Sequence, residues 1–306
     1  MKKSARIVIG SRGSPLALAQ ARMVREALAA TVPGLAAEDA IAIEVIHTTG
    51  DRFLDRPLAA IGGKGLFTKE IEEALLAQRI DLAVHSLKDM PTRLPEGLVI
   101  GACLPRADVR DALIGRPAVG IADLPQGAVV GTASLRRAAQ LLARRPDLRI
   151  VPLRGNVHTR LRKVWEGEVT ATLLAAAGLD RLGLLGEASV ILSVDEMLPA
   201  VGQGAIGVEC RADDAETLDM LALLDHVPTR QAVEVERAFL ARLEGSCRTP
   251  IAALCTIADG EAHLRGLVAS PDGRFLLRID RRVSLREAVG AAEEAADRLR
   301  RSVPPV

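Results

Sequence analysis

Apolar and polar positions along the chain follow two alternating patterns. Short runs rich in β-branched residues predict strands at residues 6–10, 41–46, 81–87 and 97–102. Longer runs with an apolar residue every three or four positions predict helices from Ser14 to about residue 30 and over 67–78, the second with Thr68 as its cap. Strands that alternate with helices of this length are typical of a parallel α/β sheet.

The same alternation returns further along the chain. It predicts strands at 128–131, 149–153 and 171–175 and helices at 134–145, 156–166 and 179–185. A stretch rich in Pro and Gly at 193–204 leads to one more strand, 205–210, which we expect to join the first sheet. From residue 229 a long helix, three strands (251–258, 262–269 and 274–279) and a helix over 284–300 predict a small antiparallel sheet with helices on one face. The predicted division is domain 1 (α/β, discontinuous) at 1–104 and 199–224, domain 2 (α/β) at 105–198, and domain 3 (α+β) at 225–306.

Cations stand at four predicted helix starts, which are those at Arg12, at Lys64, at Arg136-Arg137, and at Arg154 running on to Arg160. A cation in a first helical turn opposes the helix dipole and costs about 0.3–1 kcal/mol when nothing compensates it. An isolated pair such as Arg136-Arg137 is more often a solvated surface pair, but four such starts predict a ligand with several negative charges. All four follow a strand or its loop, so we expect them at the carboxyl edge of a sheet.

Composition narrows the classes of partner. The 306 residues include 40 Lys+Arg and 39 Asp+Glu, a formal charge of +1, which argues against binding nucleic acid through bulk charge. Aromatic residues make up only 2%, which leaves little for stacking on bases. The chain has no apolar stretch of the signal type near residue 1 and no run of about 18 apolar residues, so we expect a cytoplasmic protein without a membrane partner.

Two further positions carry candidate chemistry. Lys88-Asp89 ends the strand predicted at 81–87; it is either a plain ion pair or a site where Asp89 stabilises a developing positive charge. Cys247 lies in a Gly/Ser loop beside Arg248, which favours the thiolate, although an unremarkable loop cysteine fits the same pattern. The other cysteines, Cys103, Cys210 and Cys255, have apolar neighbours and no C-x-x-C spacing. His85 and His158 are interpreted as structural or rim residues, and five histidines without ligand spacing predict no metal site.

Seven segments in order resemble the porphobilinogen deaminase (hydroxymethylbilane synthase) family along nearly the whole chain. They are Arg12-Gly13-Ser14-Pro15-Leu16-Ala17, Gly62-Gly63-Lys64-Gly65-Leu66-Phe67, His85-Ser86-Leu87-Lys88-Asp89-Met90-Pro91, Gly131-Thr132-Ala133-Ser134-Leu135-Arg136-Arg137, Leu153-Arg154-Gly155-Asn156-Val157 with Thr159-Arg160, Pro199-Ala200-Val201-Gly202-Gln203-Gly204, and Glu244-Gly245-Ser246-Cys247.

The resemblance implies two α/β domains like the lobes of a periplasmic binding protein, plus a smaller α+β C-terminal domain with a three-stranded antiparallel sheet. It implies a monomeric transferase of tetrapyrrole (haem) biosynthesis, with one dipyrromethane cofactor joined to Cys247 by a thioether. Four porphobilinogen molecules are deaminated in turn and linked head to tail, and hydroxymethylbilane and ammonia are released.

The resemblance also assigns residues. Asp89 is the catalytic carboxylate. The cofactor-binding residues are Cys247, Lys88, Thr132, Ser134, Arg136 and Arg137. The substrate-binding residues are Arg12, Ser14, Lys64, Arg154, Arg160 and Arg181. The chain departs from the family pattern at Ala60, where a second Lys is common, and at His158, where a small residue is usual.

Two other readings of the residues stay open. A non-enzymatic, two-lobed anion-binding protein would use the same cations without chemistry, although the third domain with its loop cysteine counts against it. A ligand-sensing regulator would need a segment that reads DNA, and the sequence has no helix-turn-helix pattern. The intact mass separates these readings, because only the enzyme carries a covalent adduct.

Overall fold

The computed structural model describes residues 6–37, 39–52, 66–115, 120–243 and 249–303. Within these ranges the chain forms two compact units. Unit 1 comprises residues up to 52, 66–107 and 205–230, and unit 2 comprises 108–204 and 231–303. The finer division into three domains stays a prediction.

Unit 1 is built on a five-stranded sheet with the order β2-β1-β3-β10-β4. Strands β1 (Ile7–Ser11), β2 (Ile41–Val45) and β3 (Leu82–Ser86) are parallel. Strand β10 (Ile206–Arg211) is antiparallel to β3 and to β4 (Leu98–Cys103). The predicted return of the chain to the first sheet is therefore confirmed. The four strands predicted before it run in one direction, and only the returning strand β10 runs against them.

Helices cover both faces of this sheet. Helix α1 (Pro15–Thr31) begins with Ser14 as N-cap and Pro15 in its first turn, and packs on one face together with α8 (Ala215–Ala222). Helix α4 (Lys69–Leu76) packs on the other face through Ile71 and Leu75. It is shorter than the predicted 67–78. Two short elements, α2 (Thr49–Arg52) and the 3₁₀ turn η1 (Leu87–Asp89), follow β2 and β3.

The larger sheet of unit 2 has the order β7-β6-β8-β5-β9. Strand β6 (Val129–Gly131) is parallel to β7 (Arg149–Val151) and β8 (Ala171–Ala175), and β5 (Asp111–Gly115) is antiparallel to β8 and β9 (Val190–Ile191). Its helical segments are α5 (Leu135–Arg144), α6 (Val157–Trp165), α7 (Ala176–Asp180) and the 3₁₀ turn η2 (Leu185–Glu187). The single helix predicted at 179–185 is wrong: α7 starts directly at the end of β8, and a separate turn follows.

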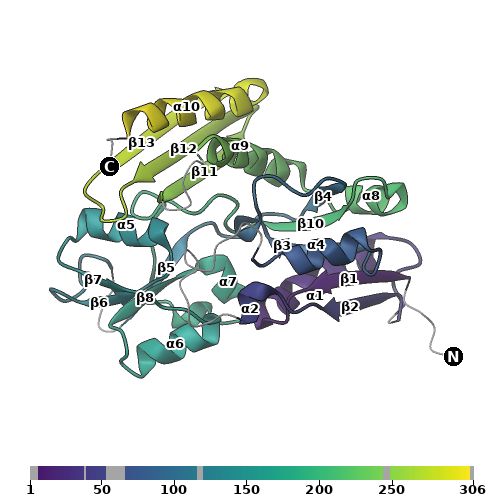
Figure 1. Ribbon diagram of the computed structural model, residues 1–306, viewed down its shortest axis with the longest axis horizontal. Helices are drawn as coiled ribbons and strands as arrows, with labels where there is room; N and C mark the ends of the chain where they lie inside the picture. The colour runs from purple at the N-terminus through teal and green to yellow at the C-terminus, as the bar shows by residue number, and fades with distance from the viewer. Residues whose placement is uncertain (1–5, 38, 53–65, 116–119, 244–248, 304–306) are drawn as a thin grey trace. The chain divides into compact units, whose positions relative to one another are not determined.

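The last part of unit 2 is a three-stranded antiparallel sheet of β11 (Ile251–Ala258), β12 (Glu261–Ala269) and β13 (Leu276–Ser284). Helices α9 (Val227–Leu243) and α10 (Ala288–Ser302, after the turn η3, Leu285–Glu287) cover one face of it (Figure 1). Phe239 and Leu264 are buried in that layer. The predicted antiparallel sheet with helices on one face is confirmed, and the predicted hairpin at Asp259-Gly260 has positive φ at both residues.

Candidate functional site

Four of the predicted site residues lie at the carboxyl edge of the unit 1 sheet. Strands β1 and β3 are parallel neighbours, so their carboxyl ends meet at the same edge. Arg12 and Ser14 follow β1, and Lys88 and Asp89 lie in η1 directly after β3. This edge therefore combines cations with one carboxylate, and Asp89 is exposed on it.

Arg12 is held by an aromatic ring and not by helix geometry. Its guanidinium lies 4.2 Å from the ring centroid of Phe67, a cation–π contact. Ser14 is the N-cap of α1, and its Oγ accepts a hydrogen bond from the Ala17 amide over 3.3 Å. The prediction that Arg12 stands in the first helical turn is wrong, because the cap lies two residues further on.

A buried amide that sequence reasoning missed fixes the end of β3. Gln20 lies on α1 and is almost fully buried; its Nε2 donates to Ser86 Oγ over 2.8 Å, and Ser86 Oγ donates back to Gln20 Oε1 over 3.1 Å. Ser86 is the last residue of β3, so this pair ties the strand to α1 immediately before Lys88 and Asp89. A polar residue on the apolar face of a predicted helix is the signal that would have found Gln20.

The remaining predicted residues of the described chain share the carboxyl edge of the large unit 2 sheet. Strand β6 lies between its parallel neighbours β7 and β8. The residues at this edge are Thr132, Ser134, Arg136 and Arg137 after β6, Arg154 and Arg160 after β7, and Arg181 after β8 and α7.

Arg136 and Arg137 lie in the first turn of α5, as predicted, and both are buried. Ser134 caps the helix by accepting from the Arg137 amide over 3.4 Å, and Thr132 Oγ1 accepts from the Ser134 amide over 3.1 Å. Among the predicted cations in the described residues, only these two occupy a first turn. Arg154 precedes the cap of α6, Asn156, and Arg160 is the fourth residue of that helix.

The anion beside these arginines belongs to the chain itself. Asp111, at the start of β5, is fully buried; its Oδ2 accepts from Arg136 Nη1 and its Oδ1 from Arg137 Nη2, each over 2.7 Å. Burial alone would raise the pKa of Asp111, but the two guanidinium groups hold it far below its ordinary value. The anion predicted at this helix start is therefore supplied in part by the side chain of Asp111, and the ligand that the sequence predicts there stays a prediction. Sequence reasoning missed Asp111, and a charged residue at the head of the short apolar run Ala112-Leu113-Ile114 was the available signal.

One carboxylate does not neutralise two guanidinium groups. Arg136 Nη1 also donates to Leu198 O and Arg137 Nη1 to Leu173 O, each over 2.8 Å, and Gln203 Nε2 donates to Asp111 Oδ1 over 3.0 Å. These partners are neutral, so among the residues that the structure describes the cluster of Asp111, Arg136 and Arg137 keeps a net charge of +1. Such a buried charge favours a second anion at this edge of the sheet.

Arg160 and Arg181 are anchored to backbone carbonyls. Arg160 Nε donates to Gly155 O and Arg181 Nη2 donates to Gly204 O, over 2.8 and 2.7 Å. Gly155 has φ +117°, and a Cβ there would lie 2.7 Å from a Thr159 methyl group, so this turn requires glycine. Burial lowers the pKa of Arg181. His158, the departure from the family pattern, is exposed.

Comparison with known proteins places this arrangement in a family. The family model described as "Porphobilinogen deaminase, dipyromethane cofactor binding domain" matches residues 7–219, and the porphobilinogen deaminase C-terminal domain matches 230–301. The chain belongs to the porphobilinogen deaminase family. The resemblance carried by the seven segments is thereby confirmed.

Relatives of this family match almost the whole chain. Porphobilinogen deaminase of Paracoccus denitrificans is 56% identical over 298 residues, covering 97% of this chain and 95% of its own length. The chloroplastic porphobilinogen deaminase of Oryza sativa is 58% identical over 276 residues, covering 90% of this chain and 77% of its own length. The porphobilinogen deaminase of a Roseiflexus species is 54% identical over 293 residues, covering 96% and 95%. Among solved structures, a periplasmic substrate-binding protein of an ABC transporter from Coxiella burnetii is 14% identical and covers 71% of this chain and 91% of its own, with a TM-score of 0.43.

Three of the four cysteines lie in the described residues. Cys103, Cys210 and Cys255 are buried free thiols, and burial raises the pKa of Cys210 to about 11. Cys247, Lys64 and Ala60 lie outside the described residues, so their predicted roles stay predictions. Across the described ranges, no group of three or more His, Cys, Asp or Glu could hold a metal ion, and no helix is long and apolar enough to cross a membrane.

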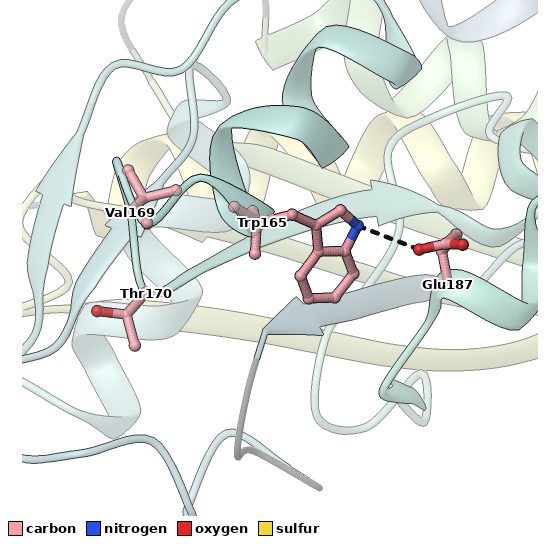
Figure 2. A pocket seen from close by; sticks show the side chains of 6 residues that line it. Trp165, Val169, Thr170 and Glu187 are labelled. Carbon is pink, nitrogen blue, oxygen red and sulfur yellow. Dashed lines mark hydrogen bonds between the residues drawn. The ribbon is translucent and has the colours of Figure 1, made fainter.

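Unit 2 also has a surface pocket of about 400 Å³ at the end of α6. Its lining includes Trp165, Val169, Thr170 and Glu187, and Trp165 Nε1 donates to Glu187 Oε2 over 3.1 Å (Figure 2). None of the predicted site residues lines this pocket.

Proposed function

We propose that this chain is a hydroxymethylbilane synthase. It deaminates four porphobilinogen molecules in turn, joins them head to tail on a covalently bound dipyrromethane, and releases hydroxymethylbilane and ammonia. The observation that carries the proposal is the buried cluster with net charge +1 at the start of α5, within the segment that the cofactor-binding domain matches. A ligand with several carboxylates suits this cluster better than a neutral one.

The residues at this edge fit the cofactor that the family implies. Each pyrrole ring carries two carboxylates, and one of them would neutralise the positive charge that Asp111 leaves on Arg136 and Arg137. We assign cofactor binding to these two arginines together with Thr132, Ser134 and Lys88, and covalent attachment to Cys247. The bound dipyrromethane supplies the pyrrole position from which the chain grows.

The remaining cations are assigned to the substrate and the growing chain, whose negative charge rises with every added ring. Arginine is suited to this task because its planar fork accepts a carboxylate through two parallel hydrogen bonds. The residues assigned are Arg12, Ser14, Lys64, Arg154, Arg160 and Arg181.

Asp89 is assigned the chemistry. Loss of ammonia leaves positive charge on the pyrrole ring of the substrate, and a fixed carboxylate at the pyrrole N–H stabilises that charge. The same carboxylate can move protons at the departing amine and at the attacked ring carbon. Its exposure on η1 leaves it open to a ligand, while the Gln20–Ser86 pair fixes the strand that carries it.

Turnover of porphobilinogen tests the proposal. The purified chain should release four molecules of ammonia for each linear tetrapyrrole, with both products followed by mass spectrometry and an ammonia assay. Binding of porphobilinogen without release of ammonia would instead favour the non-enzymatic anion-binding protein. The same proposal has the enzyme act as a monomer in the cytoplasm, and native mass spectrometry tests the first of these two statements.

A further inference from the structure

Unit 1 contains a buried group of ionisable side chains that the mechanism above does not use. It consists of Glu72 on α4, His85 on β3 and Glu209 on β10, and all three are less than 9% exposed. His85 Nε2 lies 3.0 Å from Glu209 Oε2. The second oxygen of Glu209, and Oε1 of Glu72, have no hydrogen-bond partner among the described residues. We call these three residues the acid–base cluster.

The surroundings of the acid–base cluster offer little to offset two negative charges. The apolar side chains Ile71, Leu75 and Ala83 occupy the same layer between α4 and the sheet. Burial raises the pKa of Glu72, and the negative charge on Glu209 raises it further; Thr68 and His85 act in the opposite direction without reversing the shift. With both glutamates ionised and a neutral imidazole, the cluster would bear a charge of −2 in an apolar layer, which costs several kcal/mol.

The other ionisable groups near this layer do not supply the missing positive charge. On α4, Glu73 adds a negative charge, the exposed Lys69 pairs with Glu73 over 3.9 Å, and Glu70 accepts from the Thr49 amide. On β10, Arg211 donates to the carbonyls of Leu75 and Ile80 and pairs with Asp214 and Asp81. Strand β4 adds the buried thiol of Cys103, and β1 has no ionisable side chain.

We propose that the acid–base cluster retains two protons at neutral pH, one on the His85 imidazolium paired with the Glu209 carboxylate and one on Glu72, and that His85 and Glu209 are thereby positioning residues for Asp89. This assignment brings the net charge of the cluster to zero. The role of Asp89 in it rests on the proposed function; the protonation of the cluster does not.

The link from the acid–base cluster to Asp89 runs through β10. His85 is paired with Gly207, and two residues later the Leu87 amide donates to Ala205 O over 3.1 Å. A Cβ on Gly207 would lie 2.5 Å from a Leu87 methyl group, so the first residue of η1 packs directly on this glycine. The register between β10 and β4 shifts between Val208 and Glu209, a bulge beside the ion pair. Residues 205–209 therefore hold both the His85–Glu209 pair and the turn that carries Asp89.

The first test is independent of turnover. Nitrogen NMR of the histidine rings in the full chain, with His85 assigned by the loss of its signal in His85→Gln, reports the ring's protonation. We expect a doubly protonated His85 ring at pH 7 in the wild type, since the Glu209 carboxylate 3.0 Å away stabilises the charged ring. The ring should be neutral at pH 7 in Glu209→Gln. It should be unchanged in the control Glu73→Gln, because the side chain of Glu73 is exposed on α4. A neutral His85 ring in the wild type at pH 7 would overturn the proposal.

The second test measures kcat and KM for porphobilinogen between pH 6 and 9. Glu209→Gln should lower kcat at least tenfold with KM changed less than twofold, and its alkaline limb should start at least one pH unit below that of the wild type. Glu73→Gln should keep the wild-type profile. If kcat falls by the same factor at every pH and the alkaline limb of the profile does not shift, Glu209 has a purely structural role, which contradicts the positioning role. If the wild type does not turn over porphobilinogen, the proposed function fails, while the ring measurement still decides the protonation.

Glu72→Gln provides a third test that does not depend on whether Glu209→Gln folds. A neutral amide mimics the protonated acid, so this variant should keep the His85 ring charged. The folded wild type retains a proton on Glu72 that the unfolded chain releases, so wild-type stability falls as the pH rises from the unfolded pKa of about 4 toward the raised folded pKa. Glu72→Gln should lack this fall, and its melting temperature relative to the wild type should therefore increase between pH 5 and 8. A relative melting temperature that does not change, or decreases, would show that Glu72 is ionised in the folded protein.

Discussion

Arg137 gives two of its N–H groups to a single oxygen of Asp111: its Nη2 lies 2.7 Å and its Nε 3.2 Å from Oδ1. The other carboxylate oxygen accepts from Arg136. One buried aspartate therefore anchors both arginines that we assign to the cofactor, and fixes their positions before any ligand arrives. The counter-ion is part of the fold, whereas the remaining positive charge is available to the ligand.

Removal of this counter-ion should damage the fold of unit 2. In Asp111→Asn two guanidinium groups remain buried with no carboxylate, and loss of one partner from a buried ion pair typically costs about 3–5 kcal/mol. Urea unfolding measures the loss. The matched control is Asp108→Asn, which breaks the partly exposed pair with Arg110 and should change stability by no more than about 1 kcal/mol. Equal losses in the two variants would contradict the role of Asp111.

The stability of the wild type at low pH should also depend on Asp111. The arginines hold the pKa of Asp111 below its ordinary value, so its contribution is complete above the unfolded pKa of about 4 and is lost as the pH falls toward the folded pKa. The wild type should therefore lose stability faster than Asp111→Asn between pH 4 and pH 2. Thermal melting of both proteins over this range gives the comparison, and parallel curves would show that Asp111 is not the titrating group.

Arg137→Leu should distinguish the contribution of Arg137 to protein stability from its contribution to cofactor binding. The net charge of the cluster becomes 0 in this variant and +2 in Asp111→Asn, so without cofactor Arg137→Leu should be the less destabilising of the two. Formation of the covalent adduct should nevertheless be impaired, because the excess positive charge has gone. Thermal melting of the cofactor-free and cofactor-loaded forms checks this. A larger loss of melting temperature in the free form than in the loaded form would show that Arg137 serves mainly the fold.

Asp89→Asn should remove most turnover while the fold and the adduct persist. The amide keeps the shape of the carboxylate but cannot offset a cationic intermediate. We expect kcat to fall more than tenfold, corresponding to at least about 1.4 kcal/mol of transition-state stabilisation. Asp213→Asn, at an exposed position of the same unit, is the control. A variant that retains more than about a tenth of wild-type kcat would exclude Asp89 as the main catalytic group.

The sequence was sufficient where local rules act. Ser14, Ser134 and Asn156 are helix caps because a side-chain oxygen before an apolar-periodic run satisfies free backbone N–H groups, and all three accept such bonds. The return of β10 to the first sheet was also predictable from the Pro- and Gly-rich connection and the apolar run after it.

The sequence was insufficient where partners lie far apart along the chain. Asp111 meets Arg136 across 25 residues and His85 meets Glu209 across 124, and no local pattern pairs them. Arg12 and Arg154 do not lie in a first turn, because each stands two residues before a correctly predicted cap, Ser14 or Asn156, and the dipole acts over a single turn. Family resemblance supplied the assignments of Asp89 and Cys247, for which the residues alone left plain alternatives.

The intact mass under denaturing conditions tests the central claim most directly. After incubation with porphobilinogen, the wild type should carry a covalent adduct of at least two pyrrole units, with further species one ring apart, and Cys247→Ala should show only the bare chain. Peptide mapping should place the adduct on Cys247, since Cys103, Cys210 and Cys255 are buried. A wild type at the bare mass, or an adduct that persists in Cys247→Ala, would contradict the account.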